Sequence, residues 1–191
     1  MKNLRSWIAT ATVAALLGGL LAVVPTIAQP DAAQAAVASD FTPGNIISDE
    51  KFYDGAAMSV SEIQNFLNSK VAVCRAGYTC LKDFRQTTSG RAGNEMCAAY
   101  VGLPNETAAQ IIYKVGVACG ISQQAMLVLL EKEQRLVSDD WPYDIQYRSA
   151  TGYGCPDTAP CDAQYYGFYN QVYKAAWQFK YYKAYPNSYN H

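Results

Sequence analysis

The pattern of hydrophobic and polar positions along the chain predicts a mostly helical protein. Ile63, Phe66 and Leu67 recur at helical spacing, so we expect a helix over residues 60–69. The preceding run Ser59-Val60-Ser61-Glu62 has the sequence of a capping box, which starts helices. We find no internal repeat and no stretch that alternates apolar and polar residues over more than a few positions. The pattern therefore favours helices over strands.

Two more helices are predicted in the middle of the chain. Asn105-Glu106 has the sequence of an N-cap followed by an acidic first turn, and Gly120 ends the apolar stripe behind it, which predicts a helix over residues 106–119. The stripe consists of Ala108, Ile111, Ile112, Val115 and Ala118. Ser122 is expected to cap the next helix, which continues to about Val137.

The last predicted helix begins at Asp162, ends before Pro186 and is rich in aromatic residues. Eight of the fifteen tyrosines lie after residue 160. Spacings of three and four place two overlapping sets on one helical face each: Tyr166, Tyr169 and Tyr173, and then Tyr173, Trp177 and Tyr181. Sugars stack on aromatic rings, so such a face suits a glycan platform. An aromatic stripe at this spacing is also typical of a hydrophobic core, with the hydroxyls reaching the surface.

The N-terminal residues 1–35 have the features of a secretory signal peptide. Lys2 and Arg5 precede an almost uninterrupted apolar run over residues 8–24, and Ala33-Gln34-Ala35 fits a cleavage site. The run is long for a signal peptide, so an uncleaved membrane anchor is the alternative. The signal peptide predicts a protein that is secreted or associated with the cell wall.

Two segments are expected behind the signal peptide. Residues 36–58 form a polar lead-in with turn signals, and residues 59–191 form one helical domain. The lead-in carries five apolar residues that could hold it to the core: Phe41, Ile46, Ile47, Phe52 and Tyr53.

Six cysteines follow the signal peptide, and an even number in this context indicates a disulfide framework. We favour three pairings, of which two close short loops and one spans a helical segment: Cys74–Cys80, Cys97–Cys119 and Cys155–Cys161. Zinc is the competing interpretation, but zinc sites need closer cysteine spacing or clustered histidines. His191 is the only histidine, which also argues against Ser-His-Asp and Cys-His catalysis.

The charge balance excludes two classes of partner. The formal net charge is −1, so there is no electrostatic basis for binding nucleic acid. There is no polybasic patch for a membrane surface either. The sequence carries no signal for an oligomeric state.

Glu133 is the candidate catalytic residue. In a helix, Met126, Leu130 and Glu133 lie on one face, whereas Glu131 is placed to pair with Arg135 on the surface. Apolar surroundings disfavour the charged form of a carboxyl group, which can then deliver a proton as a general acid. The alternative is a glutamate at the rim of the apolar face that pairs with a basic group or a backbone N–H.

Residues 148–155 are small and rich in glycine, so their backbone could approach a ligand closely. A turn tied by a disulfide is the alternative. Together with the aromatic helix, this loop supplies the candidate substrate-binding residues Tyr153, Tyr166, Tyr169, Gln171, Tyr173 and Trp177. Five nearby carboxylates could act with Glu133: Asp139, Asp140, Asp144, Asp157 and Asp162.

Residues 127–137, with Glu133-Gln134 at their centre, resemble the helix of the lysozyme-like superfamily, in which an apolar helix ends in a glutamate. Lytic transglycosylases and related glucosaminidases share this helix, and residues 167–178 resemble the helix that follows it in bacterial cell-wall glucosaminidases. Residues 45–182 also resemble a group of secreted actinobacterial proteins. Four runs carry this wider resemblance: Ile47-Ser48-Asp49, residues 61–67, Lys132-Glu133-Gln134 and Gly154-Cys155-Pro156-Asp157.

The resemblance implies a lysozyme-like helical domain that cleaves peptidoglycan or a similar glycan, with Glu133 as the acid and without a cofactor or metal. Two family motifs are missing: Gly152-Tyr153-Gly154-Cys155 has no Gln in its fourth place, and there is no Ala-Tyr-Asn motif. A non-catalytic, secreted glycan-binding or adhesion module on the same scaffold is therefore the second expectation.

Overall fold

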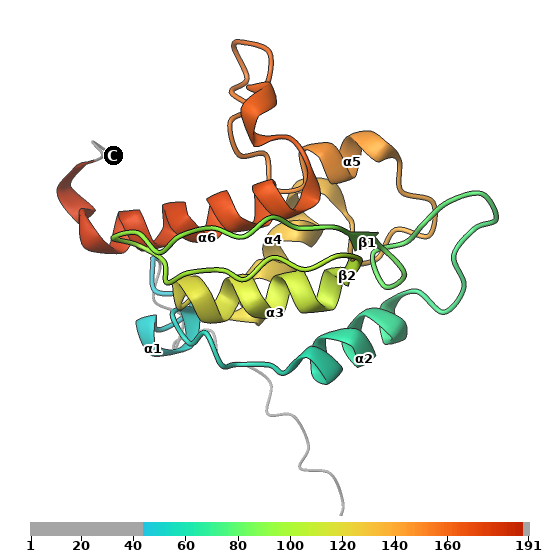
Figure 1. Cartoon of the computed structure of the whole chain (residues 1–191), viewed down its shortest axis with the longest axis horizontal. Coiled ribbons are helices and arrows are strands. Elements are labelled where there is room, and N and C mark those ends of the chain that lie inside the picture. Colours follow the sequence, from blue (N-terminus) through green and yellow to red (C-terminus); the bar gives the residue numbers. More distant parts are fainter. Residues whose placement is uncertain (1–43, 189–191) are drawn as a thin grey trace, which may run out of the picture. The chain divides into compact units, whose positions relative to one another are not determined.

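The structure, a computed structural model, describes residues 44–188 and is mostly helical, as the sequence pattern predicted (Figure 1). These residues belong to the compact unit Phe41–His191. The predicted signal peptide and its cleavage site lie outside the described residues.

Helix α3, Ala108–Cys119, forms the centre of the hydrophobic core. It packs against α2 (Val60–Lys70), α4 (Gln123–Gln134) and α6 (Phe168–Ala184) (Figure 1). Ile111, Ile112 and Val115 are completely buried between these helices. The predicted stop at Gly120 is confirmed, because this residue adopts the left-handed conformation (φ 62°) that favours glycine.

The start of α3 differs from the prediction. Thr107, and not Asn105, is the N-cap, and its side chain forms a capping box with Gln110. Glu106 belongs to the short strand β2 (Glu106–Thr107), which pairs antiparallel with β1 (Arg85–Gln86). The expectation of an acidic first turn at Glu106 was therefore wrong.

The capping box of α2 is confirmed, because Ser59 and Glu62 exchange both expected hydrogen bonds. Helix α4 begins directly after Ser122, although the Ser122 hydroxyl is buried and makes no capping bond. The helix ends at Gln134 rather than near Val137, because Arg135 turns into the left-handed region (φ 59°).

The expected surface pair between Glu131 and Arg135 is not formed. Glu131 instead accepts hydrogen bonds from the backbone N–H of Ser138 (3.0 Å) and from its hydroxyl (2.6 Å). These bonds fasten the chain that leaves α4 back onto the last turn of the helix.

The aromatic helix α6 starts later than predicted. Asp162 does act as a cap, but of the short 3-10 helix η2 (Ala163–Tyr165), where its carboxylate accepts from the backbone N–H of Gln164 (3.0 Å). Gly167, at φ 99°, is then the N-cap residue of α6. The predicted end before Pro186 is confirmed. Three short helices were not predicted: α1 (Asp49–Phe52), α5 (Asp144–Arg148) and η3 (Pro186–Ser188).

Part of the lead-in is held to the core. The rings of Phe52 and Phe179 meet edge to face at 5.1 Å, and the carbonyl of Phe52 accepts from the N–H of Ser122 (2.9 Å). Tyr53 also packs against the core, whereas Ile46 and Ile47 are exposed. Phe41 lies outside the described residues.

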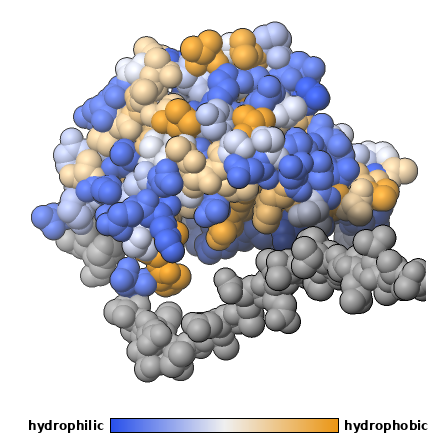
Figure 2. Space-filling view, turned by 90° about the horizontal axis from the view of Figure 1, so that it is seen from below, coloured by the Kyte–Doolittle hydropathy of each residue, from blue (hydrophilic) through white to orange (hydrophobic). Residues whose placement is uncertain are grey.

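The three disulfides are those favoured from the sequence: Cys74–Cys80, Cys97–Cys119 and Cys155–Cys161. Three disulfides in a domain of this size fit an extracellular protein. Within residues 44–188, none of the helices has the length and apolar character needed to cross a bilayer. On the face drawn in Figure 2, hydrophobic residues are interspersed with hydrophilic ones.

Glu106 is a buried carboxylate at the junction of β2 and α3, and only 2% of it is exposed. It accepts hydrogen bonds from the hydroxyls of Tyr100 (2.8 Å) and Thr88 and from the ammonium of Lys114 (2.5 Å). Burial raises the pKa of Glu106, but the hydrogen bonds from these three groups lower it and together hold it below its ordinary value. This network fixes the segment that leads into the central helix.

The lowered pKa predicts that Glu106 makes the fold sensitive to acid. Its contribution is fully present above the unfolded-state pKa of about 4.3 and is lost as the pH falls through the lower folded-state pKa. We expect Glu106→Gln to reduce the free energy of unfolding at neutral pH by about 2 kcal/mol, and this difference to shrink in acid. Urea unfolding across pH 2–7 measures this, with exposed Glu95→Gln as the control. A difference independent of pH would contradict the assignment.

Candidate functional site

Glu133 lies in the last turn of α4, where its carboxylate reaches the surface. The side chain is 31% exposed, and the ammonium of Lys132 lies 2.9 Å from Oε1. Met126 and Leu130 of the same helix are completely buried beneath it. Glu133 is therefore not enclosed in an apolar wall. Because the Lys132 side chain is 74% exposed, this ion pair is a weak surface interaction that a ligand can replace.

The second carboxylate oxygen of Glu133 faces the glycine-rich loop. A methyl group placed on Gly152 would lie 3.3 Å from Glu133 Oε2. Gly152 also has a positive φ of 68°, a conformation that side chains rarely adopt. Glycine at this position therefore lets the backbone of the loop approach the carboxylate closely.

The glycine-rich loop is held in place by the side chain of Gln171, which is completely buried in α6. Its Oε1 accepts from the backbone N–H groups of Thr151 (3.1 Å) and Tyr153 (3.1 Å). Its Nε2 donates to the carbonyls of Tyr153 (2.9 Å) and Tyr165 (2.8 Å). The Thr151 hydroxyl donates to the Gln171 backbone carbonyl (3.0 Å). One amide thus fixes the residues on both sides of Gly152. We refer to this arrangement as the Gln171 clamp.

Gln171, a candidate substrate-binding residue of the aromatic helix, is completely buried, and its side-chain amide bonds to the loop. Tyr169 and Tyr173 are likewise buried, at 3% and 2% exposure. Their hydroxyls accept from Arg91 Nε (3.1 Å) and Asn94 Nδ2 (2.9 Å). Tyr169 and Tyr173 therefore belong to the core, the alternative given for the aromatic stripe.

The other three predicted aromatic residues are half-buried and reach the surface. Tyr153 meets Tyr165 edge to face at 4.8 Å, and Tyr165 packs against Gly154. Trp177 stacks on Tyr181 at 5.3 Å. Tyr166 lies before α6 begins, so it does not share a helical face with Tyr169 and Tyr173; its ring contacts the Arg148 guanidinium.

Sequence reasoning missed three residues of this surface: Tyr165, Lys174 and Arg91. Lys174 lies between the rings of Tyr165 (5.4 Å) and Trp177 (5.3 Å). Its position three residues before Trp177 on the same helix was the available signal. Arg91 comes from a loop far away in the sequence, and no local pattern indicated that it contacts α6.

Two of the candidate partner carboxylates are engaged elsewhere. Asp139 accepts from the side chain of Gln146 (2.9 Å) and from the backbone N–H of Trp141 (3.0 Å). Asp162 caps η2.

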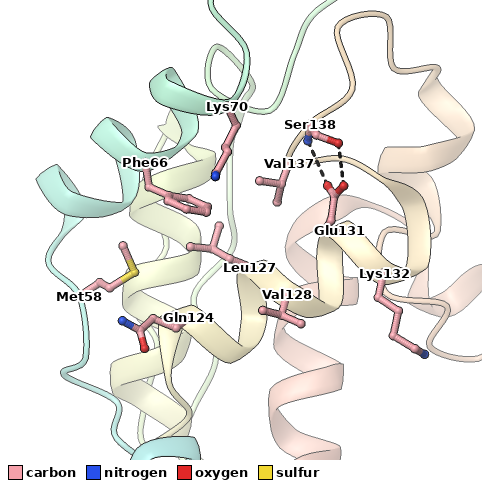
Figure 3. Close-up of a pocket in the computed structure, with 10 residues that line it drawn as sticks. All are labelled: Met58, Phe66, Lys70, Gln124, Leu127, Val128, Glu131, Lys132, Val137 and Ser138. Carbon is pink, nitrogen blue, oxygen red and sulfur yellow. Dashed lines mark hydrogen bonds between the residues drawn. The ribbon is translucent and has the colours of Figure 1, made fainter. Parts of the chain in front are cut away.

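A surface hollow lies between α2 and α4 (Figure 3). It has a volume of about 650 Å³ and a largely apolar lining that includes Met58, Phe66, Leu127 and Val128. Glu131 borders it but is turned toward Ser138, and Glu133 is not part of its lining. Lys132 also borders the hollow, but none of the catalytic or substrate-binding residues predicted from the sequence lines it.

In comparisons with protein-family models, curated proteins and solved structures, nothing matches this chain.

The Gln171 clamp predicts that Gln171→Met destabilises the glycine-rich loop more than the rest of the fold. Methionine has a similar volume but leaves the buried backbone groups of Thr151 and Tyr153 unpaired, so we expect a loss of roughly 2–4 kcal/mol. Hydrogen exchange at residues 150–166, with thermal unfolding, measures the effect. Gln124→Met, at an exposed position of α4, is the matched control. Unchanged exchange in this loop would show that the clamp does not hold it.

Proposed function

We propose that this protein is a secreted enzyme that cleaves a cell-wall glycan, peptidoglycan or a similar polymer, with Glu133 as the general acid. The observation that carries the proposal is the exposed Glu133 carboxylate facing Gly152 in a loop that Gln171 holds rigidly. A general acid needs access to the substrate and a well-defined surface beside it. The 31% exposed side chain of Glu133 gives the access, and the loop held by Gln171 gives the surface. The three disulfides support action outside the cell.

In the proposed reaction, the Glu133 carboxyl donates its proton to the oxygen that bridges two sugars, and the bond from that oxygen to the anomeric carbon breaks. The resulting Glu133 carboxylate then accepts the proton of a hydroxyl on the same sugar while that oxygen bonds to the anomeric carbon. The ring closes, Glu133 regains its proton and no water is consumed. One glutamate suffices for this lytic route, whereas hydrolysis needs a second carboxylate or a positioned water.

In the proposed reaction, Lys132 gives up its ion pair with Glu133 when the substrate binds. Its ammonium forms an ion pair with Oε1 of Glu133, whereas Oε2 faces Gly152. Because the pair is exposed, a sugar hydroxyl can displace the ammonium at little cost.

The second candidate function is a non-catalytic glycan-binding module that uses the same half-buried aromatic residues. The Lys132–Glu133 pair favours it, because it gives Glu133 a partner within the protein. Under this alternative, Glu133 contributes to the surface only, and binding to the wall persists without cleavage.

Glu133→Gln distinguishes the two functions. Glutamine keeps the size of the side chain but cannot donate a carboxyl proton, so we expect peptidoglycan clearing to fall at least about 100-fold while the fold is retained. Turbidity of purified peptidoglycan measures clearing, and near-UV circular dichroism monitors the fold. Glu131→Gln, two positions earlier on α4, is the matched control and should clear at the parent rate.

Two outcomes would contradict the cleavage proposal. Equal clearing by parent and Glu133→Gln would remove Glu133 from the mechanism. Absence of clearing by the parent, with the protein retained on the insoluble wall, would favour the binding module; absence of both would contradict both functions.

A further inference from the structure

Two cations, Lys174 of α6 and Arg91 of a loop that contacts α6, lie near each other and have no acidic partner among residues 44–188. Lys174 and Asn170 are one turn apart on α6, and the Arg91 guanidinium donates to the side-chain oxygen of Asn170 (2.5 Å). Arg91 also lies over the rings of Tyr169 and Tyr173. Neither cation forms an ion pair with a carboxylate of residues 44–188.

The placement of these two positive charges near each other is electrostatically unfavourable. Burial lowers the pKa of Lys174, and the nearby charge of Arg91 lowers it further. The contacts of Arg91 with a hydroxyl, an amide and two rings leave its charge unneutralised. An anion bound between the two side chains would offset both effects.

The surroundings indicate what kind of molecule carries the anion. Lys174 lies between Tyr165 and Trp177, and Trp177 stacks on Tyr181, so flat rings flank the cations. A series of contacts connects Lys174 with the proposed acid. Glu133 faces Gly152, which precedes Tyr153 in the chain. The ring of Tyr153 contacts that of Tyr165, and Lys174 lies over the Tyr165 ring. Aromatic rings suit sugar faces, and the cations suit an acidic substituent on the same strand.

We propose that Arg91 and Lys174 form an anion site that receives a carboxylate of an acidic glycan strand, which lies along Tyr165 and Trp177. The proposal relies on the proposed function for the identity of the strand, but it concerns recognition and not cleavage. It makes the protein selective for glycans that bear carboxylates, such as those carrying lactyl or peptide groups, over neutral ones.

Calorimetric titration of the oxidised Glu133→Gln protein tests this selectivity without turnover. The two ligands are a soluble disaccharide–peptide fragment of peptidoglycan and the same fragment with its carboxyl groups amidated. We expect the acidic fragment to bind about tenfold more tightly at low salt, as expected for one charge-assisted hydrogen bond. Lys174→Met should abolish this preference, and Lys174→Arg should keep it. Exposed Lys51→Met is the matched control and should bind both fragments like the parent.

The outcomes separate this proposal from the cleavage proposal. Equal binding of the two fragments, or a preference that survives Lys174→Met in a folded protein, overturns the anion site even if the protein clears peptidoglycan. A preference lost in Lys174→Met and kept in Lys174→Arg supports the anion site even if the parent clears nothing.

Discussion

The side-chain amide of Gln171 connects the helical core to the surface on which a ligand would lie. The Gln171 side chain is completely buried, and its amide forms hydrogen bonds with backbone groups of Thr151, Tyr153 and Tyr165. Without these bonds, the buried N–H and carbonyl groups of the loop would be unsatisfied, which is costly. Gly152 lies between two fixed residues and is therefore held beside Glu133. The position of the proposed acid relative to its surroundings depends on this amide.

The core supplies a rigid base for the clamp. Helix α3 is buried against α2, α4 and α6, so α4 and α6 are fixed relative to each other, and these are the helices that carry Glu133 and Gln171. The Cys155–Cys161 disulfide closes the far part of the loop that Gln171 holds. A rigid helix end and a rigid loop thus face each other across an exposed carboxylate, the kind of preorganisation that proton transfer to a bound glycan requires.

Much of this structure follows from local sequence signals, and the remainder depends on contacts between distant residues. The capping box at Ser59, the stop at Gly120 and the three disulfides were predictable because each depends on spacing along the chain. The face of α6 that belongs to the core could not be predicted. Periodicity shows that Tyr169 and Tyr173 share one side of the helix, but it does not show that this side is buried. The role of Gln171 was hidden for a related reason: its partner Thr151 is twenty residues away.

The measurement that tests the location of the site most directly is an amide chemical-shift titration of the Glu133→Gln protein with soluble peptidoglycan fragments. We predict that the largest shifts occur at Gly152, at Tyr153 and at the indole N–H of Trp177, and that Met58, Phe66 and Leu127, which line the hollow between α2 and α4, stay unchanged. Shifts concentrated at that hollow, or no shifts at millimolar fragment, would contradict the assignment of the glycan site to the clamped loop.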